Sequence, residues 1–135
     1  SIWSQMKTMQ KLILIMVCLG MSSLSIAAQQ SDQIQAKLDY ALKQCLDQNY
    51  VQSGAYKIEQ LNDFSYHIEN LPFSSVEQHL KMIGFVEENT KAFFTETELM
   101  HLETSGDRQG NKIFEKCMQF YHSQHLKKFI KQLKE

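Results

Sequence analysis

The sequence predicts an all-α fold, a compact bundle of about four to five helices closed by one disulfide. Three observations support this class. Apolar residues recur at spacings of three and four along most of the chain, no stretch alternates convincingly between apolar and polar residues, and two cysteines lie far apart on helical segments. The 135 residues are 43% hydrophobic, with five Gly and one Pro, which fits one packed domain and excludes collagen-like or disordered chains.

Residues 1–28 have the composition of a secretory signal peptide. Two lysines and no acid precede or flank the apolar run 12–19, and small residues end the segment before a polar stretch. The apolar run is shorter than the roughly 20 residues that span a bilayer. We therefore expect cleavage after Ala27 or Ala28, leaving residues 29–135 as a single helical domain. The alternatives are a membrane anchor or a buried amino-terminal helix.

The expected mature chain is mildly acidic and keeps two cysteines. Residues 29–135 carry 12 basic and 15 acidic side chains, so no basic excess favours nucleic acid as a partner. An even number of cysteines in an exported chain predicts a disulfide between Cys45 and Cys117, and two free buried thiols are the alternative. Closing a loop of about 70 residues would stabilise the fold by roughly 4 kcal/mol in the chain-entropy model.

Three helical stretches are expected in the first part of this domain. Residues 31–49 repeat apolar side chains at helical spacing behind a capping Ser-Asp pair. A weaker helical stretch follows the turn at Gly54 and ends before Pro72, because the residue preceding a proline disfavours the α conformation. Residues 74–78 contain overlapping capping boxes, which predict a third helix that reaches about Asn89.

The last part of the chain is expected to place a loop between helices. Residues 90–104 set phenylalanine, leucine and methionine among several acids and predict a short helix or two helical turns. Residues 104–111 are the most polar and glycine-rich stretch of the mature chain and predict a loop. Helical spacing returns at Ile113 and continues to the end of the chain, where Ser123 could cap a separate final helix.

No group of residues in the sequence completes a catalytic or metal site. Ser53 lacks the G-x-S-x-G setting of a serine nucleophile. His122 and His125 lie one helical turn apart, and Glu98 and His101 have the spacing of half a di-iron motif. A zinc site needs three or four ligands, so surface or capping histidines are favoured over a metal site. We therefore expect no enzymatic activity, no metal and no cofactor.

An exported helical domain without an active site is expected to act by binding another molecule. The best candidate contact is the loop 104–111, because it is too long for a tight turn and is flanked by helices that could hold it. An ordinary solvated connection is the alternative. Four lysines in the last predicted helix interact favourably with its dipole, because they lie near its carboxyl end. A membrane-surface role is the alternative. These residues are Lys127, Lys128, Lys131 and Lys134.

Two segments carry a resemblance to a known family. Residues 40–46 (YALKQCL) and 116–123 (KCMQFYHS) resemble the type VI secretion amidase immunity proteins, and residues 66–86 resemble the middle section of that family. The resemblance covers most of residues 36–125. Both cysteines of the expected mature chain fall where the family has its paired cysteines.

The resemblance implies a periplasmic homodimer that binds two copies of a papain-like peptidoglycan amidase, whose Cys-His-acid site cuts the bond between D-glutamate and diaminopimelate. In that family a protruding loop enters the substrate groove of the enzyme and inhibits it by occlusion. By order along the chain, the implied effector-binding residues here are Ser105, Gly106, Asp107, Arg108, Gln109 and Gly110. The alternative function is an exported binding module, such as a ligand carrier or an envelope chaperone, unrelated to toxin immunity.

Overall fold

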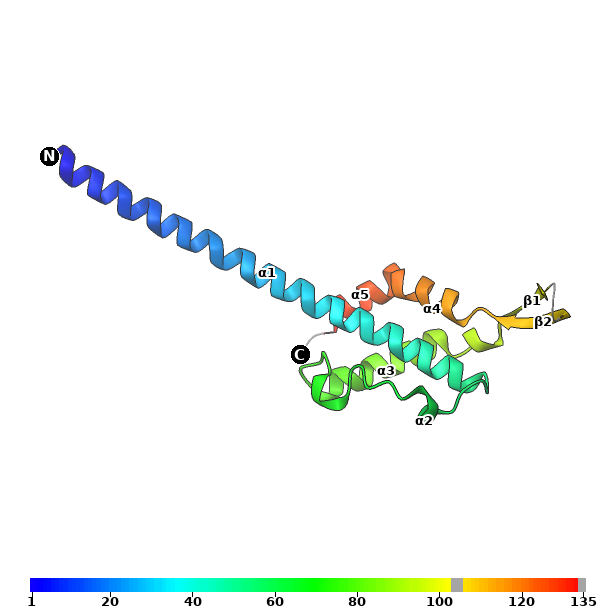
Figure 1. Cartoon of the computed structure of the whole chain (residues 1–135). Coiled ribbons are helices and arrows are strands. Elements are labelled where there is room, and N and C mark those ends of the chain that lie inside the picture. The colour runs from blue at the N-terminus through cyan, green and yellow to red at the C-terminus, as the bar shows by residue number, and fades with distance from the viewer. Residues whose placement is uncertain (103–105, 134–135) are drawn as a thin grey trace. The chain divides into compact units, whose positions relative to one another are not determined.

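The computed structural model describes residues 1–102 and 106–133, and the side chains of residues 14–24 and 102 lie outside this description. Its helical elements are α1 (Ile2–Gln52), α2 (Ile58–Leu61), the 3-10 helix η1 (Ile68–Asn70), α3 (Val76–Thr90), the 3-10 helix η2 (Phe93–Thr95), α4 (Ile113–His122) and α5 (Gln124–Gln132) (Figure 1). Strands β1 (Thr97–Leu102) and β2 (Gly106–Asn111) lie between η2 and α4. The predicted class, a helical domain closed by one disulfide, is confirmed, with a small hairpin added to it.

The chain divides into two compact units, residues 1–34 and residues 35–135. The first unit is the amino-terminal part of α1, and the apolar side chains that the structure describes between residues 2 and 13 are exposed. Within the described part of the chain, no helix is long and apolar enough to cross a membrane.

Helix α1 continues through the position where the sequence predicts a helix start at residue 31. The helix runs without a break from Ile2 to Gln52, so the predicted capping residues lie inside it and its end falls three residues later than expected. The reason is that residues 27–30 are Ala-Ala-Gln-Gln, which are good helix formers, and nothing there interrupts the backbone hydrogen bonds.

The core of the second unit lies between the carboxyl-terminal half of α1 and helices α3, α4 and α5. The side chains with no exposed surface include Ala41, Cys45, Met82, Val86, Ile113, Cys117 and Leu126. Cys45 on α1 and Cys117 on α4 form the predicted disulfide, so the alternative of two free thiols is excluded. Disulfides of this kind are typical of proteins that fold in oxidising compartments outside the cytoplasm.

The helix boundaries of α3 and α5 follow the capping signals in the sequence. Ser75 precedes α3, and its side chain accepts a hydrogen bond from the backbone N–H of Gln78. Ser123 precedes α5 in the same way and accepts a hydrogen bond from Leu126 at 3.2 Å. Each serine thereby satisfies one of the N–H groups that a helix start leaves without an intrahelical partner. The predicted separate final helix is confirmed.

Residues 53–75, which we call the strap, form little of the expected second helix. Only α2 and η1 are helical, and none of the strap side chains is fully buried. Asn62 and Tyr66 adopt left-handed backbone conformations, with φ values of 42° and 58°. These conformations end a right-handed helix, so apolar spacing alone overstated the helical content of this stretch.

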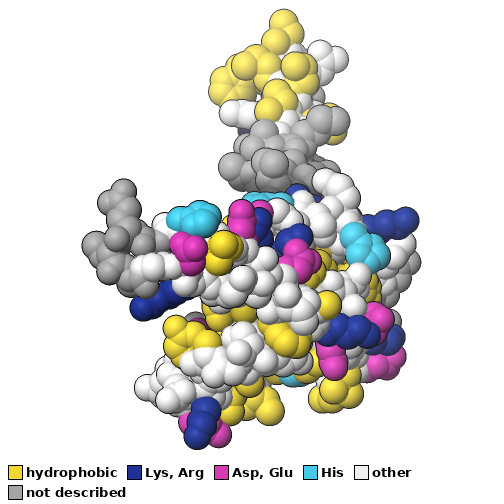
Figure 2. Space-filling view, turned by 90° about the vertical axis from the view of Figure 1, so that its right-hand side faces the viewer, with side chains coloured by type: hydrophobic (Ala, Val, Ile, Leu, Met, Phe, Trp, Pro, Cys, Tyr) yellow, Lys and Arg dark blue, Asp and Glu magenta, His cyan; other side chains and the backbone are white. Residues whose placement is uncertain are grey.

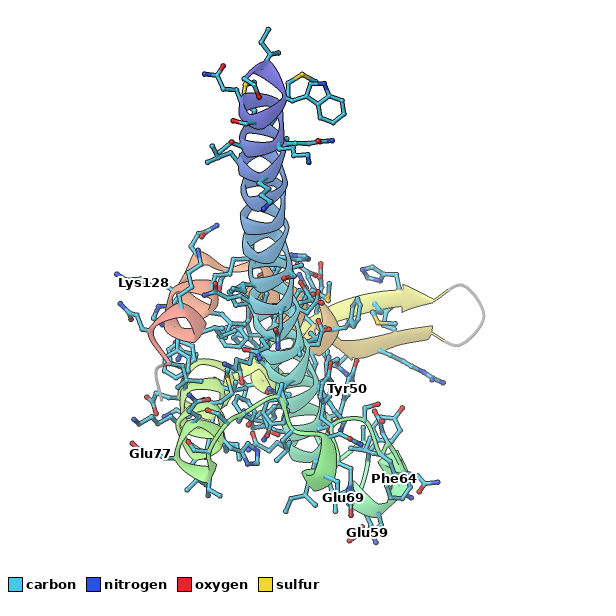
Figure 3. The ribbon with its side chains drawn as sticks, turned by 90° about the vertical axis from the view of Figure 1, so that its left-hand side faces the viewer. Tyr50, Glu59, Phe64, Glu69, Glu77 and Lys128 are labelled. Carbon is cyan, nitrogen blue, oxygen red and sulfur yellow. A yellow bond between two sulfur atoms is a disulfide. The ribbon has the colours of Figure 1, made fainter. Side chains whose placement is uncertain are left out.

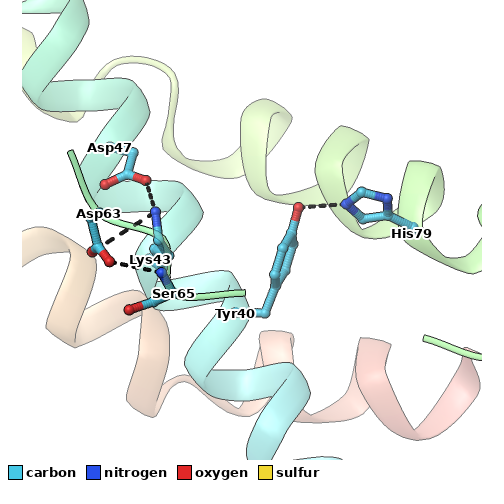
Figure 4. Close-up of polar contacts among 6 residues, drawn as sticks. All are labelled: Tyr40, Lys43, Asp47, Asp63, Ser65 and His79. Carbon is cyan, nitrogen blue, oxygen red and sulfur yellow. Dashed lines mark hydrogen bonds and ion pairs between the residues drawn. The ribbon is translucent and has the colours of Figure 1, made fainter. Parts of the chain in front are cut away.

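The strap is held to α1 and α3 by polar and aromatic contacts (Figure 4). Lys43 pairs with Asp47 on its own helix and lies 3.9 Å from the carboxylate of Asp63 on the strap. Asp63 also accepts a hydrogen bond from the backbone N–H of Ser65. Hydrogen bonding by the side chain and the backbone of Ser65, together with the charge of Lys43, lowers the pKa of the Asp63 carboxyl. Phe73 of the strap stacks on His79 of α3 with 5.3 Å between the ring centroids, and His79 is itself joined to α1 by a hydrogen bond of 2.7 Å between its Nε2 and the hydroxyl of Tyr40.

Residues 97–102 and 106–111 pair as the two antiparallel strands of a hairpin, where the sequence predicts helical turns followed by a loop. The register pairs Thr97 with Asn111 and Met100 with Arg108. Among the residues of the hairpin whose burial the structure describes, all are exposed except Gly110, which is half-buried. Strands with no buried face need no alternation of apolar and polar residues, so the sequence pattern gives no strand signal here. The predictions of helical turns over 97–102 and of a loop over 106–111 are therefore wrong.

Candidate functional site

Five of the six predicted contact residues lie together on strand β2. They are Gly106, Asp107, Arg108, Gln109 and Gly110. The sixth, Ser105, lies outside the described residues, as does Thr104 of the predicted loop. The predicted contact segment is therefore one strand of a hairpin that leaves the helical domain next to α4 (Figure 1).

The two faces of the hairpin carry different chemistry, because successive residues of a strand point to opposite faces. On one face the carboxylate of Asp107 is hydrogen-bonded to Nδ1 of His101, its partner on the other strand, at 2.9 Å. On the other face Arg108 lies opposite Met100. Arg108 is the only arginine of the chain, and it makes no ion pair with any residue that the structure describes. The hairpin thus offers a guanidinium that is free to bind an acidic partner.

Two ion pairs connect the base of the hairpin to the start of α4. The ammonium of Lys112 lies 2.8 Å from the carboxylate of Glu98, and that of Lys116 lies 2.7 Å from the carboxylate of Glu96. The hydrogen bond and the charge of Lys112 lower the pKa of the Glu98 carboxyl, and Glu98 in turn raises the pKa of Lys112. The backbone N–H of Lys112 also donates to the carbonyl of Glu96 at 3.3 Å, so the two ends of the hairpin are joined.

A buried asparagine connects the hairpin base to the disulfide. Asn49 has no exposed surface, and its Nδ2 donates to the carbonyl of Cys45 at 2.9 Å. Its Oδ1 accepts from the backbone N–H of Phe94 in η2, also at 2.9 Å. Sequence reasoning missed this residue. The available signal was a polar side chain four residues after a buried cysteine, on the same face of its helix.

Gly110 leaves room for the side chain of Met100 on one face of the hairpin. A Cβ atom at this position of β2 would overlap the side chain of Met100, which belongs to the neighbouring strand β1. Glycine is the residue that permits such an approach. Gly106 has a different role, because its φ of +75° at the start of β2 is a left-handed conformation that favours glycine.

The candidate metal ligands from the sequence do not come together. Glu98 and His101 lie on a strand, where a spacing of three puts side chains on opposite faces, so they do not form half of a di-iron helix motif. His125 is hydrogen-bonded to Asn89 at 3.1 Å, and His122 is exposed. In residues 1–102 and 106–133 no three His, Cys, Asp or Glu side chains are grouped so that they could hold a metal ion.

The lysines of the last helix are exposed or half-buried. Lys127, Lys128 and Lys131 lie on α5 and form no ion pair with a described residue, while Lys134 lies outside the description. Of these, Lys131 lies in the last turn of α5, where positive charge is favourable to the helix dipole.

No protein-family model, no curated protein and no solved structure matches this chain. The fold and the site together define a helical, disulfide-closed domain that presents an exposed β-hairpin.

Proposed function

We propose that this protein is a periplasmic immunity protein that binds and inhibits a cognate type VI secretion peptidoglycan amidase. It inserts the hairpin 97–111 into the active-site groove of the enzyme and so protects the cell from intoxication by itself or its siblings. The observation that carries the proposal is an exposed hairpin whose base is joined to α4 by two ion pairs. The resemblance of residues 40–46 and 116–123 supports the same function, as do the leader-like residues 1–28.

Inhibition by this hairpin would be steric and would need no chemistry from the protein. A two-stranded hairpin is thin, and glycines at positions 106 and 110 keep β2 narrow. The guanidinium of Arg108, which pairs with no described residue, is suited to a carboxylate of the partner, because arginine presents several fixed donors and keeps its charge. Asp107 already contacts His101 within the hairpin, so its first role is to hold the two strands together.

The proposal is tested with the enzyme encoded by the gene next to this one. The purified protein is expected to inhibit hydrolysis of peptidoglycan fragments in a stoichiometric manner. A variant in which residues 97–111 are replaced by two glycines is expected to lose inhibition. The helical fold should survive, because Glu96 and Lys112 are already hydrogen-bonded to each other at the hairpin base. Full inhibition by the shortened variant would contradict the role of the hairpin.

A matched pair of substitutions tests whether Arg108 of the hairpin contributes to binding of the enzyme. Arg108→Ala is expected to weaken binding of the enzyme by about tenfold or more, the usual scale for a charge-assisted contact in an interface. Lys131→Ala removes an exposed, unpaired cation from α5 and is expected to leave binding unchanged. The homodimer that the resemblance implies is tested on the same samples by light scattering after size exclusion.

A cavity beneath the strap favours the alternative function, an exported binding module. The cavity has a volume of about 210 Å³, and its lining includes Tyr40, Lys43, Tyr66 and His79. If the protein is a ligand carrier, native mass spectrometry of protein purified from its own compartment should detect a bound small molecule. A ligand-free protein that inhibits the neighbouring enzyme would exclude this alternative.

A further inference from the structure

Strand β2 has a row of backbone groups that point away from β1. The backbone N–H of Lys112 donates to the carbonyl of Glu96, so these two residues are a hydrogen-bonded pair at the hairpin base. In an antiparallel ladder, hydrogen-bonded and non-hydrogen-bonded pairs alternate. By the observed register, Asp107, Gln109 and Asn111 then belong to non-hydrogen-bonded pairs, and their N–H and C=O groups point outward. These groups, which we call the open edge of β2, have no backbone partner among the described residues.

The open edge of β2 has none of the usual protection against the addition of another strand. Figures 1 and 3, two views at right angles, show the hairpin projecting away from the helices. Edge strands are commonly protected by a proline, a lysine or a bulge. Strand β2 has the sequence GDRQGN and pairs residue for residue with β1, so it contains no such feature. The side chains of Asp107, Gln109 and Asn111 are exposed, so another backbone can approach this edge.

Arg108 gives the open edge a preference for an acidic partner. On its face of the hairpin, Glu98 pairs with Lys112 at 2.8 Å, whereas the guanidinium of Arg108 forms no ion pair with a described residue. Figure 2 shows acidic, basic and histidine side chains where the hairpin projects from the surface. Side chains of neighbouring strands lie about 5 Å apart at their Cβ atoms. An acidic side chain on a strand added to β2 would therefore lie within reach of Arg108.

We propose that the open edge of β2 binds an extended, acid-bearing segment in the groove wall of the enzyme by β-strand addition. This inference rests on the proposed function. In recognition of this kind, main-chain hydrogen bonds supply affinity and the flanking side chains supply specificity. Here the backbone of Asp107 and Gln109 forms the hydrogen bonds, and Arg108 selects the acid. A two-stranded hairpin is marginally stable by itself, so a third strand also stabilises the hairpin.

Amide hydrogen exchange of the unchanged protein, measured by nuclear magnetic resonance with and without the enzyme, tests the proposal directly. The outward N–H groups of Asp107 and Gln109 are expected to exchange rapidly in the free protein. In the complex their exchange should slow by about tenfold or more, because each gains a hydrogen bond. The N–H groups of Thr97 and Leu99 point outward from the opposite edge of the hairpin and are expected to be slowed much less.

Three variants separate the backbone donor at position 109 from its side chain. Gln109→Pro removes the outward N–H and is expected to weaken binding of the enzyme by about tenfold or more, because a carbonyl of the partner loses its donor. Gln109→Ala keeps this N–H and is expected to bind within about twofold of the unchanged protein. Leu99→Pro makes the same backbone change on the opposite edge and is also expected to retain binding.

The hairpin should tolerate proline at both positions, because neither N–H takes part in the pairing of β1 with β2. Cross-strand nuclear Overhauser contacts between Met100 and Arg108 check that it does. If a proline variant loses these contacts, the exchange measurement on the unchanged protein decides alone.

Three results would overturn strand addition at β2 and leave the proposed function intact, provided that the unchanged protein inhibits the enzyme. The first is rapid exchange of the Gln109 amide in the complex. The second is equal binding by Gln109→Pro and Gln109→Ala, or equal weakening by Gln109→Pro and Leu99→Pro. The third is slow exchange at Gln109 in the concentrated free protein, which would assign the edge to a second copy of this chain. If the unchanged protein does not bind the enzyme at all, the proposed function fails, and this inference fails with it.

Discussion

The helical core and the hairpin of this protein are stabilised by different interactions. In the core, side chains such as Met82, Val86 and Ile113 are fully buried, and a disulfide joins α1 to α4. The hairpin buries almost nothing and depends on cross-strand backbone pairing and on ion pairs at its base. Residues with no role in packing can change without loss of the fold, so the hairpin is the part of the domain best able to be matched to a partner.

The largest expected effect concerns the disulfide of the core. Replacing both Cys45 and Cys117 with Ala is expected to lower the free energy of unfolding by about 4 kcal/mol, because the bond closes a loop of 72 residues. Urea denaturation followed by circular dichroism measures this loss. The unchanged protein in excess reductant should behave like the double variant. A difference below about 1 kcal/mol would show that the core does not depend on the cross-link.

The next effect compares a buried and an exposed leucine. Leu126→Ala on α5 removes a side chain with no exposed surface and is expected to cost about 3 kcal/mol of unfolding free energy. Leu80→Ala on α3 removes a side chain that is 61% exposed and is expected to cost less than about 0.5 kcal/mol. Equal losses in the two variants, measured by urea denaturation, would mean that the core does not lie where the buried side chains place it.

Asn49 connects the two regions, so its substitution tests whether they are coupled. Asn49→Ala leaves the half-buried backbone N–H of Phe94 without its acceptor, which is expected to cost about 2 kcal/mol. Asn89→Ala is the control. Its Nδ2 donates to the carbonyl of Phe85 four residues earlier, as Nδ2 of Asn49 donates to the carbonyl of Cys45, but Asn89 is half-buried. Hydrogen exchange at the Phe94 amide should accelerate only in the first variant. Unchanged exchange there would argue against the coupling.

Replacing glycine with alanine is expected to destabilise the hairpin but to stabilise the helical core. Gly106→Ala forces an L side chain into a φ of +75° and is expected to destabilise the hairpin by about 1 kcal/mol. Gly84→Ala lies within α3, where an added Cβ meets no atom within 4 Å, and is expected to stabilise the core by about 0.5 kcal/mol. Cross-strand nuclear Overhauser contacts report the first change, and the midpoint of urea denaturation reports the second.

The smallest effect is the response of the hairpin to pH. Lys112 lowers the pKa of the Glu98 carboxyl below its ordinary value of 4.5. A lowered pKa means that the stabilising pair is complete above the unfolded-state pKa and is lost as the pH falls through the folded-state value. Backbone amide shifts across the hairpin should therefore move slightly and reversibly as the pH falls below 4.5. Glu98→Gln should remove this response, and its persistence would assign the titration to another group.

The sequence predicted the regions in which burial or capping dictates structure. The buried cysteines indicated the disulfide, and the serines before α3 and α5 indicated where these helices begin. The hairpin could not be predicted, because its strands have no buried face and so no alternating pattern. The sequence predicted a polar loop over residues 104–111, whereas the pairing of residues 106–111 with residues 97–102 depends on backbone hydrogen bonds that composition does not encode.

The left-handed strap residues Asn62 and Tyr66 could not be predicted either. Both lie in a stretch with apolar spacing typical of a weak helix, and the ring of Tyr66 packs edge-on against Tyr40 of α1, which is distant in the sequence. Asn49 was missed for a related reason. A buried amide becomes recognisable only when its partner, the backbone of Phe94, has been placed beside it.

The disulfide has a consequence for the protein's resistance to proteases. Cys45 precedes both the strap and the hairpin in the chain, and Cys117 follows both. The exposed strap and hairpin are the segments that a protease is expected to cut first. A single cut in either one divides the backbone into two fragments that the disulfide still joins. The nicked protein would therefore remain one covalent molecule, and its two fragments would separate only on a reducing gel.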